Sequence, residues 1–300
     1  MRRALNTAGL ALFAILAFLA VLPLFLIIID VYTKGISAIL RLGGLNFLFD
    51  IPPSPDAERG GVGPLLVGTL YMTLLGAIVG ILLGFPLGVY IGEFRKEYFA
   101  NISRGGVNIL VEFPTITVGL FVYALFSLSL VDINPILENM ANVLSGAVGD
   151  WVKYFVGGLS QFNAYAGALA LAIIMVPYVA LFTASAYATI DQNTREAAYA
   201  IAGREYKAVF IVLRKAVSRA VLVAVLLGTA KIAGETAPLL FTAYGNYFYS
   251  PFTQATGAIP HWIWYAAQTP YDVQIASAYG AAAVLLTIVL AIFLAARSRR

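Results

Sequence analysis

LLVGTLYMTLLGAIVGILLGFPLGVYI, residues 65–91, is a continuous apolar stretch that contains no charged side chain. An α-helix needs about 20 apolar residues to cross the roughly 30 Å hydrocarbon core of a bilayer, and this stretch exceeds that length. Its apolar residues run without the polar alternation of a membrane β-strand, so a helix is favoured over a barrel. The stretch therefore predicts a membrane-spanning α-helix.

The composition of the whole chain agrees with this prediction. Of its 300 residues, 61% are hydrophobic and only 11% are charged, and the mean hydropathy is +0.86. A soluble domain carries about 25% charged residues, so most of this chain is expected to face lipid. The sequence predicts an all-α, multi-pass protein of the cell membrane that forms one transmembrane domain over residues 1–300. Six spans are expected, at about residues 8–29, 65–91, 107–130, 164–188, 220–240 and 275–296.

The basic residues indicate the orientation of these spans. With the N-terminus placed in the cytoplasm, the outer segments hold only Lys34, Arg41, Arg59 and Lys153, and Lys231 lies within a span. The other basic residues then lie in cytoplasmic segments, as the positive-inside rule requires, so both termini are expected to be cytoplasmic. The net charge of +4 follows from this distribution, and no nucleic-acid partner is expected.

Two of the outer segments have distinctive compositions. Residues 132–163 mix acidic and apolar positions and are expected to include a short interfacial helix. Residues 244–274 carry an aromatic surface near the outer headgroups, which is either an interfacial belt, the favoured interpretation, or a docking surface for a partner. This surface consists of Tyr247, Tyr249, His261, Trp262, Trp264 and Tyr265.

The sequence lacks the residue patterns of catalysis. It contains no Gly-Lys pair, which a P-loop for ATP requires, and one histidine without any cysteine cannot form a His/Cys metal site or a Cys-His nucleophile pair. Glu93, Glu112 and Asp30 lie near the ends of predicted spans, where helix capping or snorkelling explains them. We therefore expect no catalytic, metal or cofactor site and no enzyme activity, and any energy must come from an ion gradient or another subunit.

Two ionisable residues, Lys231 and Glu235, fall inside the predicted span at 220–240. A charge in the hydrocarbon core costs at least about 2.5–3.5 kcal/mol, so each is expected to be paired or to face a watery cavity. Their i,i+4 spacing places them on one helix face, where a purely structural ion pair is one interpretation. The favoured one is a substrate pathway, in which Lys231 attracts an anion and Glu235 weakens its retention.

The long cytoplasmic segment at about residues 189–219 is predicted to be an amphipathic helix. Tyr199, Tyr206, Phe210 and Leu213 recur at helical spacing and would form one apolar stripe. Because the segment is tethered between two spans, this stripe is expected to be buried either in the membrane surface or in a groove of a cytoplasmic partner.

Part of this segment, EAAYAIAGREYKAVFIVL at residues 196–213, resembles the EAA loop of permease subunits of binding-protein-dependent ABC importers. The family pattern places a glycine where this chain has Ala202, with Gly203 following, and Arg214 stands where a proline is usual. In that family the loop is the coupling helix that docks into an ATPase subunit. The resemblance therefore implies coupling residues at Glu196, Ala197, Ala198, Gly203, Tyr206 and Phe210.

Two other segments resemble the phosphate permeases of the PstA type within this family. GETAPLLFTA, residues 234–243, is similar to a phosphate-permease signature in which Lys231 takes the place of the usual arginine. PPSPDAERGGVGPLLVGTL, residues 52–70, resembles the proline-rich loop of the same proteins. The related PstC type usually departs from the signature after GET, so the continuation APLLFTA favours the PstA type.

The resemblance implies a type I ABC importer permease that forms half of a pore for inorganic phosphate. Its expected partners are a second homologous permease in a heterodimer, two ATPase subunits, an external phosphate-binding protein and membrane lipid. An importer of sulfate or molybdate would share the EAA loop without the GETAPLLFTA match. A gradient-driven secondary transporter or channel would not need the cytoplasmic loop, and a purely structural subunit would tolerate the loss of Lys231.

Overall fold

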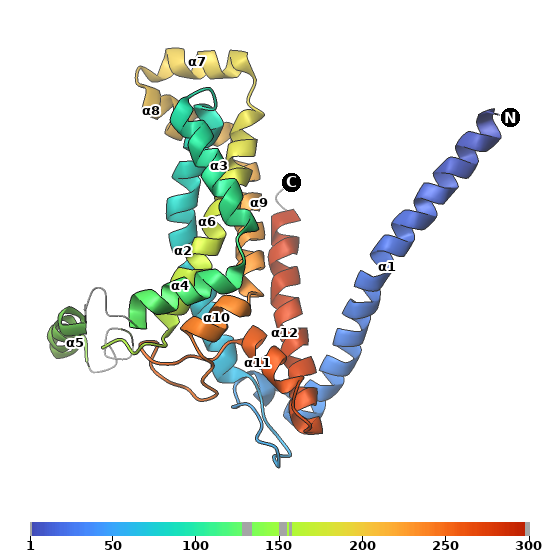
Figure 1. The fold of residues 1–300 in the computed structure, drawn as a ribbon, viewed down its shortest axis with the longest axis vertical. Coiled ribbons are helices and arrows are strands. Elements are labelled where there is room, and N and C mark those ends of the chain that lie inside the picture. Colours follow the sequence, from blue (N-terminus) through green and yellow to red (C-terminus); the bar gives the residue numbers. More distant parts are fainter. Residues whose placement is uncertain (1, 128–133, 150–154, 156–157, 298–300) are drawn as a thin grey trace.

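The computed structural model describes residues 2–127, 134–149, 155 and 158–297, and helices dominate this part of the chain (Figure 1). The predicted all-α class is therefore confirmed. Besides the short 3₁₀ helix η1 (Gly44–Leu48) and the π-helical segment η3 (Ala208–Leu213), the helices are α1 (Arg2–Leu42), α2 (Gly63–Glu93), α3 (Tyr98–Glu112), α4 (Thr115–Ser127), α5 (Asn134–Val148), α6 (Ala164–Ala188), α7 (Gln192–Ala202), α8 (Glu205–Lys207), α9 (Arg214–Ala233), α10 (Ala237–Thr242), α11 (Ile259–Ala266) and α12 (Asp272–Arg297).

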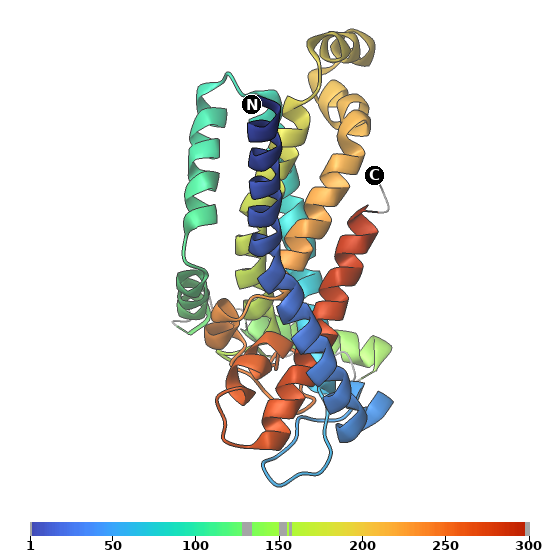
Figure 2. The same ribbon diagram turned by 90° about the vertical axis from the view of Figure 1, so that its right-hand side faces the viewer.

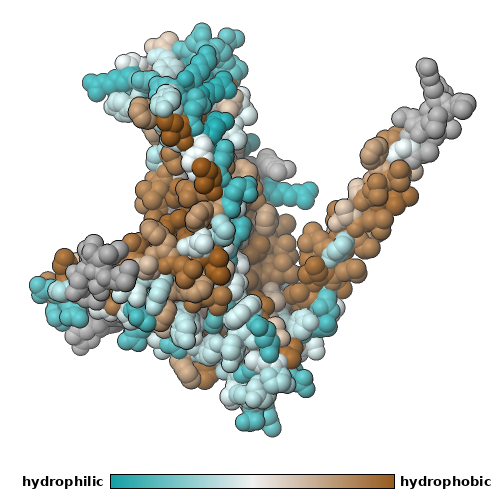
Figure 3. Space-filling model, in the orientation of Figure 1, coloured by the Kyte–Doolittle hydropathy of each residue, from teal (hydrophilic) through white to brown (hydrophobic). Residues whose placement is uncertain are grey.

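Among the described residues, four helices are long and apolar enough to cross a bilayer: α1 over Gly9–Leu42, α2, α6 and α12. The bent pair α3–α4 makes five if its two parts together form one span. α2, α6 and α12 occupy the segments predicted at 65–91, 164–188 and 275–296, whereas the apolar run at 8–29 is part of a much longer helix. Hydrophobic residues cover the middle of the molecule and α1, and hydrophilic residues gather at both ends (Figure 3).

The span predicted at 107–130 is wrong as a single straight helix. α3 ends at Glu112, α4 begins at Thr115, and the two helix axes differ in direction by 100°. Pro114 stands at the break, and a proline lacks a backbone N–H and disfavours helical geometry in the residue before it. Phe113 is accordingly extended, with φ −69° and ψ 132°. Residues 128–130 of this prediction lie outside the described residues.

The span predicted at 220–240 is also interrupted. α9 ends at Ala233, and α10 starts only at Ala237, with Pro238 in its first turn. Gly234 at the end of α9 and Pro238 after it are both unfavourable inside a helix, which explains the break. α9 itself packs between α6 and α12 in the bundle, so the pair Lys231 and Glu235 lies at the end of a bundle helix.

The centre of the fold is the pair α2 and α6, which approach each other closely along a stripe of small residues. A Cβ atom at Gly88 would lie 2.5 Å from the Ala180 carbonyl oxygen and 2.6 Å from the Thr183 Cβ, so only glycine fits there. Small residues at such spacing let helix backbones approach in membranes, where packing drives association. The glycine stripe, in which every fourth residue of α2 faces α6 in this way, comprises Gly76, Gly80, Gly84, Gly88 and Gly92.

α1 lies against the bundle only near its C-terminal end and diverges from it toward the N-terminus (Figure 1). In the view of Figure 2, α1 lies in front of the bundle. Gly35 packs on the Tyr279 carbonyl and Ala283 of α12, and the hydroxyls of Tyr32 and Thr287 form a hydrogen bond of 3.1 Å. The most apolar part of α1 contributes no buried residue to the structure. Its hydrophobic surface must therefore be covered by lipid or by another chain.

The end of the molecule opposite α7 is built by α11 and the connections around it. A helix, α5, does occur within residues 132–163, as expected. The aromatic surface predicted at 244–274 is only partly a surface. Trp264 and Tyr249 are half exposed, but Trp262 is buried, contacts Tyr247 edge to face and donates its indole N–H to Ser277.

His261, on α11, is 8% exposed, and within the described part of the chain its Nδ1 has no hydrogen-bond partner. Burial lowers the pKa of this imidazole below its ordinary value of 6.5. As the pH falls, the unfolded chain therefore takes up a proton before the folded one does, so stability is full above about pH 6.5 and decreases below it. We expect the thermal unfolding midpoint in detergent to fall between about pH 7 and pH 5, the range of histidine titration. His261→Phe should make the unfolding midpoint less dependent on pH. If the midpoint of that variant changes with pH as much as that of the parent chain, the dependence comes from other groups.

Candidate functional sites

Lys231 and Glu235 are brought together as the sequence predicts, but not on a continuous helix. Lys231 is in the last turn of α9, Glu235 follows its end, and the ammonium contacts the carboxylate oxygen Oε1 directly. The two side chains differ in exposure: Lys231 is 43% exposed and Glu235 only 10%. The pair therefore combines an accessible cation with a buried carboxylate that keeps it partly neutralised.

This arrangement can bind an anion weakly. An ammonium has three N–H donors, and the Glu235 carboxylate occupies only one direction around the Lys231 nitrogen. The remaining donors of the accessible side chain are available to the oxygens of an oxyanion, and the neighbouring negative charge of Glu235 opposes tight retention. Together these properties are those of a site that binds an oxyanion without holding it tightly.

The second candidate site is α7, which lies across one end of the bundle (Figure 1). Asp191 caps the N-terminus of α7 by accepting hydrogen bonds from the backbone N–H and the hydroxyl of Thr194, at 2.8 and 2.6 Å, and these bonds lower the pKa of Asp191. Gly203 ends α7 in the left-handed conformation, with φ 66°. The shift of glycine from position 202 to 203 thus places it where the backbone requires it.

The turn at Gly203 overturns one prediction, a single amphipathic helix across 189–219. Tyr199 precedes the turn, whereas Tyr206 and Phe210 follow it on α8 and η3, so they cannot share one stripe with it. Tyr206 is 54% and Phe210 40% exposed, while Leu213 is buried. The left-handed residue redirects the chain, and periodicity across it has no structural meaning.

The predicted coupling residues are distributed over both sides of this turn. Glu196 and Ala197 are exposed on α7, and the Glu196 carboxylate accepts a hydrogen bond from Gln192 at 2.9 Å. Gly203, Tyr206 and Phe210 are exposed beyond it. Ala198 is different, because it is buried with Val89 and Leu213 and faces the bundle. The exposed members face outward at the end of the bundle.

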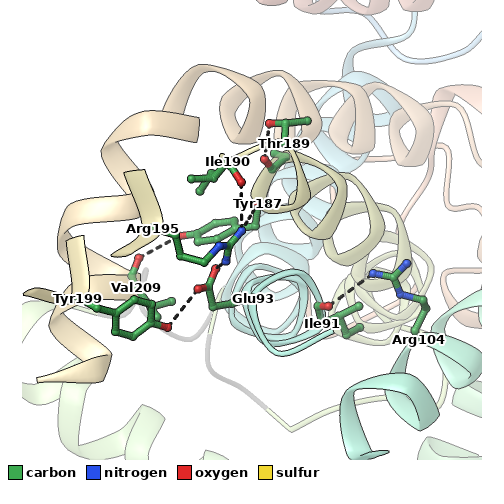
Figure 4. A network of polar contacts seen from close by, with 10 residues as sticks. Ile91, Glu93, Arg104, Tyr187, Thr189, Ile190, Arg195, Tyr199 and Val209 are labelled. Carbon is green, nitrogen blue, oxygen red and sulfur yellow. Dashed lines mark hydrogen bonds and ion pairs between the residues drawn. The ribbon is translucent and has the colours of Figure 1, made fainter. Parts of the chain in front are cut away.

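Sequence reasoning missed the contacts that hold α7 in place (Figure 4). Arg195 pairs with Glu93, at the end of α2, and the hydroxyl of Tyr199 donates to the other oxygen of the same carboxylate at 3.1 Å. Arg195 also donates to the backbone carbonyls of Tyr187, at 3.1 Å, and Ile190, at 3.4 Å. We refer to Glu93, Arg195 and Tyr199 as the α7 clamp.

The two charged side chains of the α7 clamp are largely buried, and Tyr199 is partly buried. The side chains of Glu93 and Arg195 are 2% and 11% exposed, and burial together with the Glu93 charge raises the pKa of Tyr199 to about 12. The interpretation of Glu93 by helix capping or snorkelling at a span end is therefore wrong, because its carboxylate turns inward to Arg195 and Tyr199. The available signal was the i,i+4 spacing of Arg195 and Tyr199, which places two donors on one face of α7.

Gly203→Ala should loosen the end of α7. An L-residue in the left-handed region costs about 1–2 kcal/mol, which favours fraying of the adjacent turn. We expect faster hydrogen exchange over residues 192–202 in the alanine variant, and a smaller effect for Gly203→Asn because asparagine tolerates this conformation better. Gly105→Ala is the control, because a Cβ atom added at this helical position would meet no atom of another segment within 4 Å, and it should leave exchange over 192–202 unchanged. Equal exchange in Gly203→Ala and the parent chain would contradict this role of Gly203.

Comparison with known proteins places this geometry in a family. The sequence profile described as "Binding-protein-dependent transport system inner membrane component" matches residues 84–300. A protein of Methanocaldococcus jannaschii named "Probable phosphate transport system permease protein PstA" is 37% identical over 284 residues, which cover 94% of this chain and 89% of that protein. The PstA proteins of Xylella fastidiosa strain Temecula1 and Haemophilus influenzae are 30% and 29% identical, covering 99% and 88% of this chain and 93% and 82% of their own lengths.

A solved structure supports the fold. The inward-facing MetNI methionine ABC transporter superposes with a TM-score of 0.53 over 79% of this chain and 94% of that chain, at 18% sequence identity. The predicted ABC importer permease fold and the predicted family are thus confirmed. The chain belongs to the binding-protein-dependent transport system inner membrane components and, among them, to the PstA-type permeases.

Proposed function

We propose that this chain is the transmembrane permease subunit of an ATP-driven importer of inorganic phosphate and forms half of its pore without catalysing a reaction itself. The observation that carries the proposal is the similarity to proteins named PstA over 94% of the chain, which includes the GETAPLLFTA segment beside Lys231. The accessible ammonium of Lys231 beside the buried Glu235 fits a site that binds a small oxyanion without retaining it.

Other subunits supply the remaining parts of the importer. A second homologous permease completes the pore, an external phosphate-binding protein delivers the substrate, and two cytoplasmic ATPase subunits provide the energy. α7 is the coupling helix, and its exposed residues, with Glu196 and Ala197 among them, dock into an ATPase subunit. Closure of the ATPase dimer moves α7 and rocks the spans, so that the site at Lys231 opens to one side of the membrane and then to the other. Both termini of this chain lie in the cytoplasm.

Phosphate uptake into sealed vesicles tests the proposal directly. The vesicles contain this chain with its candidate permease, ATPase and binding-protein partners, and uptake is compared between ATP and a non-hydrolysable analogue. Uptake that requires hydrolysable ATP and resists an excess of sulfate or molybdate supports a phosphate importer. Uptake that sulfate or molybdate abolishes would identify an importer of another oxyanion. Gradient-driven uptake by this chain alone, without ATP, would contradict the importer and indicate a secondary transporter.

A further inference from the structure

We propose that the α7 clamp transmits the movement of the coupling helix mainly to the pair α2–α6. The π-helical segment η3 acts as a flexible connection, so α9 follows this movement less closely. Glu93 and Arg195 would then be positioning residues that transmit motion and never contact the substrate. This inference rests on the proposed function only in taking α7 as the point where the ATPase acts. The clamp itself can be tested without any partner.

The first step is the strength of the attachment between α7 and α2–α6. Glu93 belongs to the last turn of α2, and it accepts from Arg195 and Tyr199, one helical turn apart on α7. Arg195 reaches α6 as well, through the Tyr187 carbonyl. Charge-assisted hydrogen bonds are about twice as strong as neutral ones, and burial shields these from water and salt. α7 is therefore bonded to the ends of both α2 and α6 through a single guanidinium.

The second step is the rigidity of the helix pair α2–α6, to which α7 is bonded. Along the glycine stripe, a Cβ at Gly84, Gly88 or Gly92 would come within 2.9 Å of α6 atoms, so the two backbones lie in direct contact. Closely packed interiors transmit displacement and do not absorb it. The stripe runs up to Gly92, the residue before Glu93, so α2 and α6 are locked together where the clamp attaches.

The third step is the irregular chain connection between α7 and α9. The chain passes from α7 through the left-handed Gly203 and the three-residue α8 into η3, before α9 begins at Arg214. In η3 the Val209 carbonyl accepts from the Arg214 N–H, five residues on, and from the neutral hydroxyl of Tyr187 at 3.2 Å. π-helical turns are rare and frequently occur at functional sites. A connection with two irregular points can change its geometry with less resistance than a packed helix pair.

The absence of cysteine in this chain allows spin labels to be attached at introduced cysteines alone. One label pair joins exposed Asn193 on α7 to exposed Lys96, just beyond α2, and the other joins Asn193 to exposed Lys215 at the start of α9. In the purified chain we expect a narrower distance distribution for 193–96 than for 193–215. The clamp is contradicted if the 193–96 distribution is as broad as, or broader than, the other.

The variant that isolates the clamp is Glu93→Leu combined with Arg195→Met. Removing both charges avoids leaving one of them buried and unpaired, and such replacements are commonly tolerated by the fold. We expect the 193–96 distribution to broaden in this double variant and 193–215 to change little. The matched control, Asp30→Leu with Lys34→Met, removes an ion pair from the exposed surface of α1 and should leave both distributions unchanged.

The assembled importer provides the functional measurement. With the clamp removed, we expect the ATPase to bind and hydrolyse ATP as before, while phosphate transported per ATP falls about 5- to 150-fold, the usual range of coupling between sites. Wild-type transport per ATP in that variant would overturn the transmission role. Failure of the unmodified chain to bind the ATPase or take up phosphate would instead contradict the proposed function, and the label distances would still decide the clamp.

Discussion

Gly88→Leu is expected to prevent α2 and α6 from packing and to leave almost no folded protein. Even a methyl group at this position would lie 2.5 Å from the Ala180 carbonyl oxygen and 2.9 Å from the Ala180 Cα, and these are backbone atoms that cannot rotate away. The helices must separate, which breaks the contacts of the whole glycine stripe. We expect a loss of more than about 4 kcal/mol, which is exceptional for a single substitution and within reach of severe overpacking.

The measurement is the yield of monodisperse protein in detergent and the thermal unfolding midpoint of whatever remains. Gly105→Ala is the control, since a Cβ atom added at Gly105 in α3 would meet no atom of another segment within 4 Å, and alanine in a helix is about 0.5–1 kcal/mol better than glycine. The thermal unfolding midpoint of Gly88→Ala should lie between those of Gly88→Leu and Gly105→Ala. Wild-type stability of Gly88→Leu would mean that α2 and α6 do not meet at this position.

Lys231→Met is expected to abolish phosphate uptake and also to weaken the protein. It removes the accessible ammonium that we assign to the pathway, and it leaves the buried Glu235 carboxylate without its cation. Breaking a buried ion pair by removing one partner costs about 3–5 kcal/mol, of which only part applies here because Lys231 is 43% exposed. Lys231→Arg keeps the charge and should retain uptake.

Loss of stability and loss of transport can be separated with a second variant. Lys231→Met combined with Glu235→Gln removes both charges, so thermal stability should recover while uptake remains absent. The control is Lys34→Met, which breaks an i,i+4 pair with Asp30 (2.8 Å) on the exposed surface of α1 and should leave uptake unchanged. Uptake at the wild-type rate by the double variant would remove Lys231 and Glu235 from the pathway.

Hydropathy predicts the parts of this fold that depend on composition alone. The segments 65–91, 164–188 and 275–296 correspond to α2, α6 and α12, because a long apolar run in lipid has few alternatives to a helix. The same criterion failed at Pro114, where the chain stays apolar while it turns by 100°. Hydropathy reports which solvent a segment prefers and carries no information about its direction.

In the candidate sites, too, only contacts between residues close in the sequence could be predicted. The spacing of Lys231 and Glu235 predicts their contact, since both lie within one local segment. The pairing of Glu93 with Arg195 joins residues 102 positions apart, and no local pattern specifies which of the carboxylates near span ends turns inward. Gly203 was only partly predictable. Its residue type suggests a turn, but apolar residues recur at helical spacing on both sides of it and favoured a continuous helix instead.

The length of α1 has a consequence for the choice of lipid. Its spanning part, Gly9–Leu42, has 34 residues, and at 1.5 Å per residue it is about 51 Å long, against a hydrocarbon layer of about 30 Å. The charge-free part of this helix, residues 9–29, is about 32 Å long and matches that layer. The following part, with Asp30, Lys34 and Arg41, must therefore emerge from the layer unless the helix tilts. Because α1 packs against the bundle only through its C-terminal part, which includes Gly35, Ala38 and Leu42, a thicker or thinner bilayer acts mainly on the N-terminal part of this helix. Changing the acyl-chain length of the lipids thus offers a way to change mainly the position of α1.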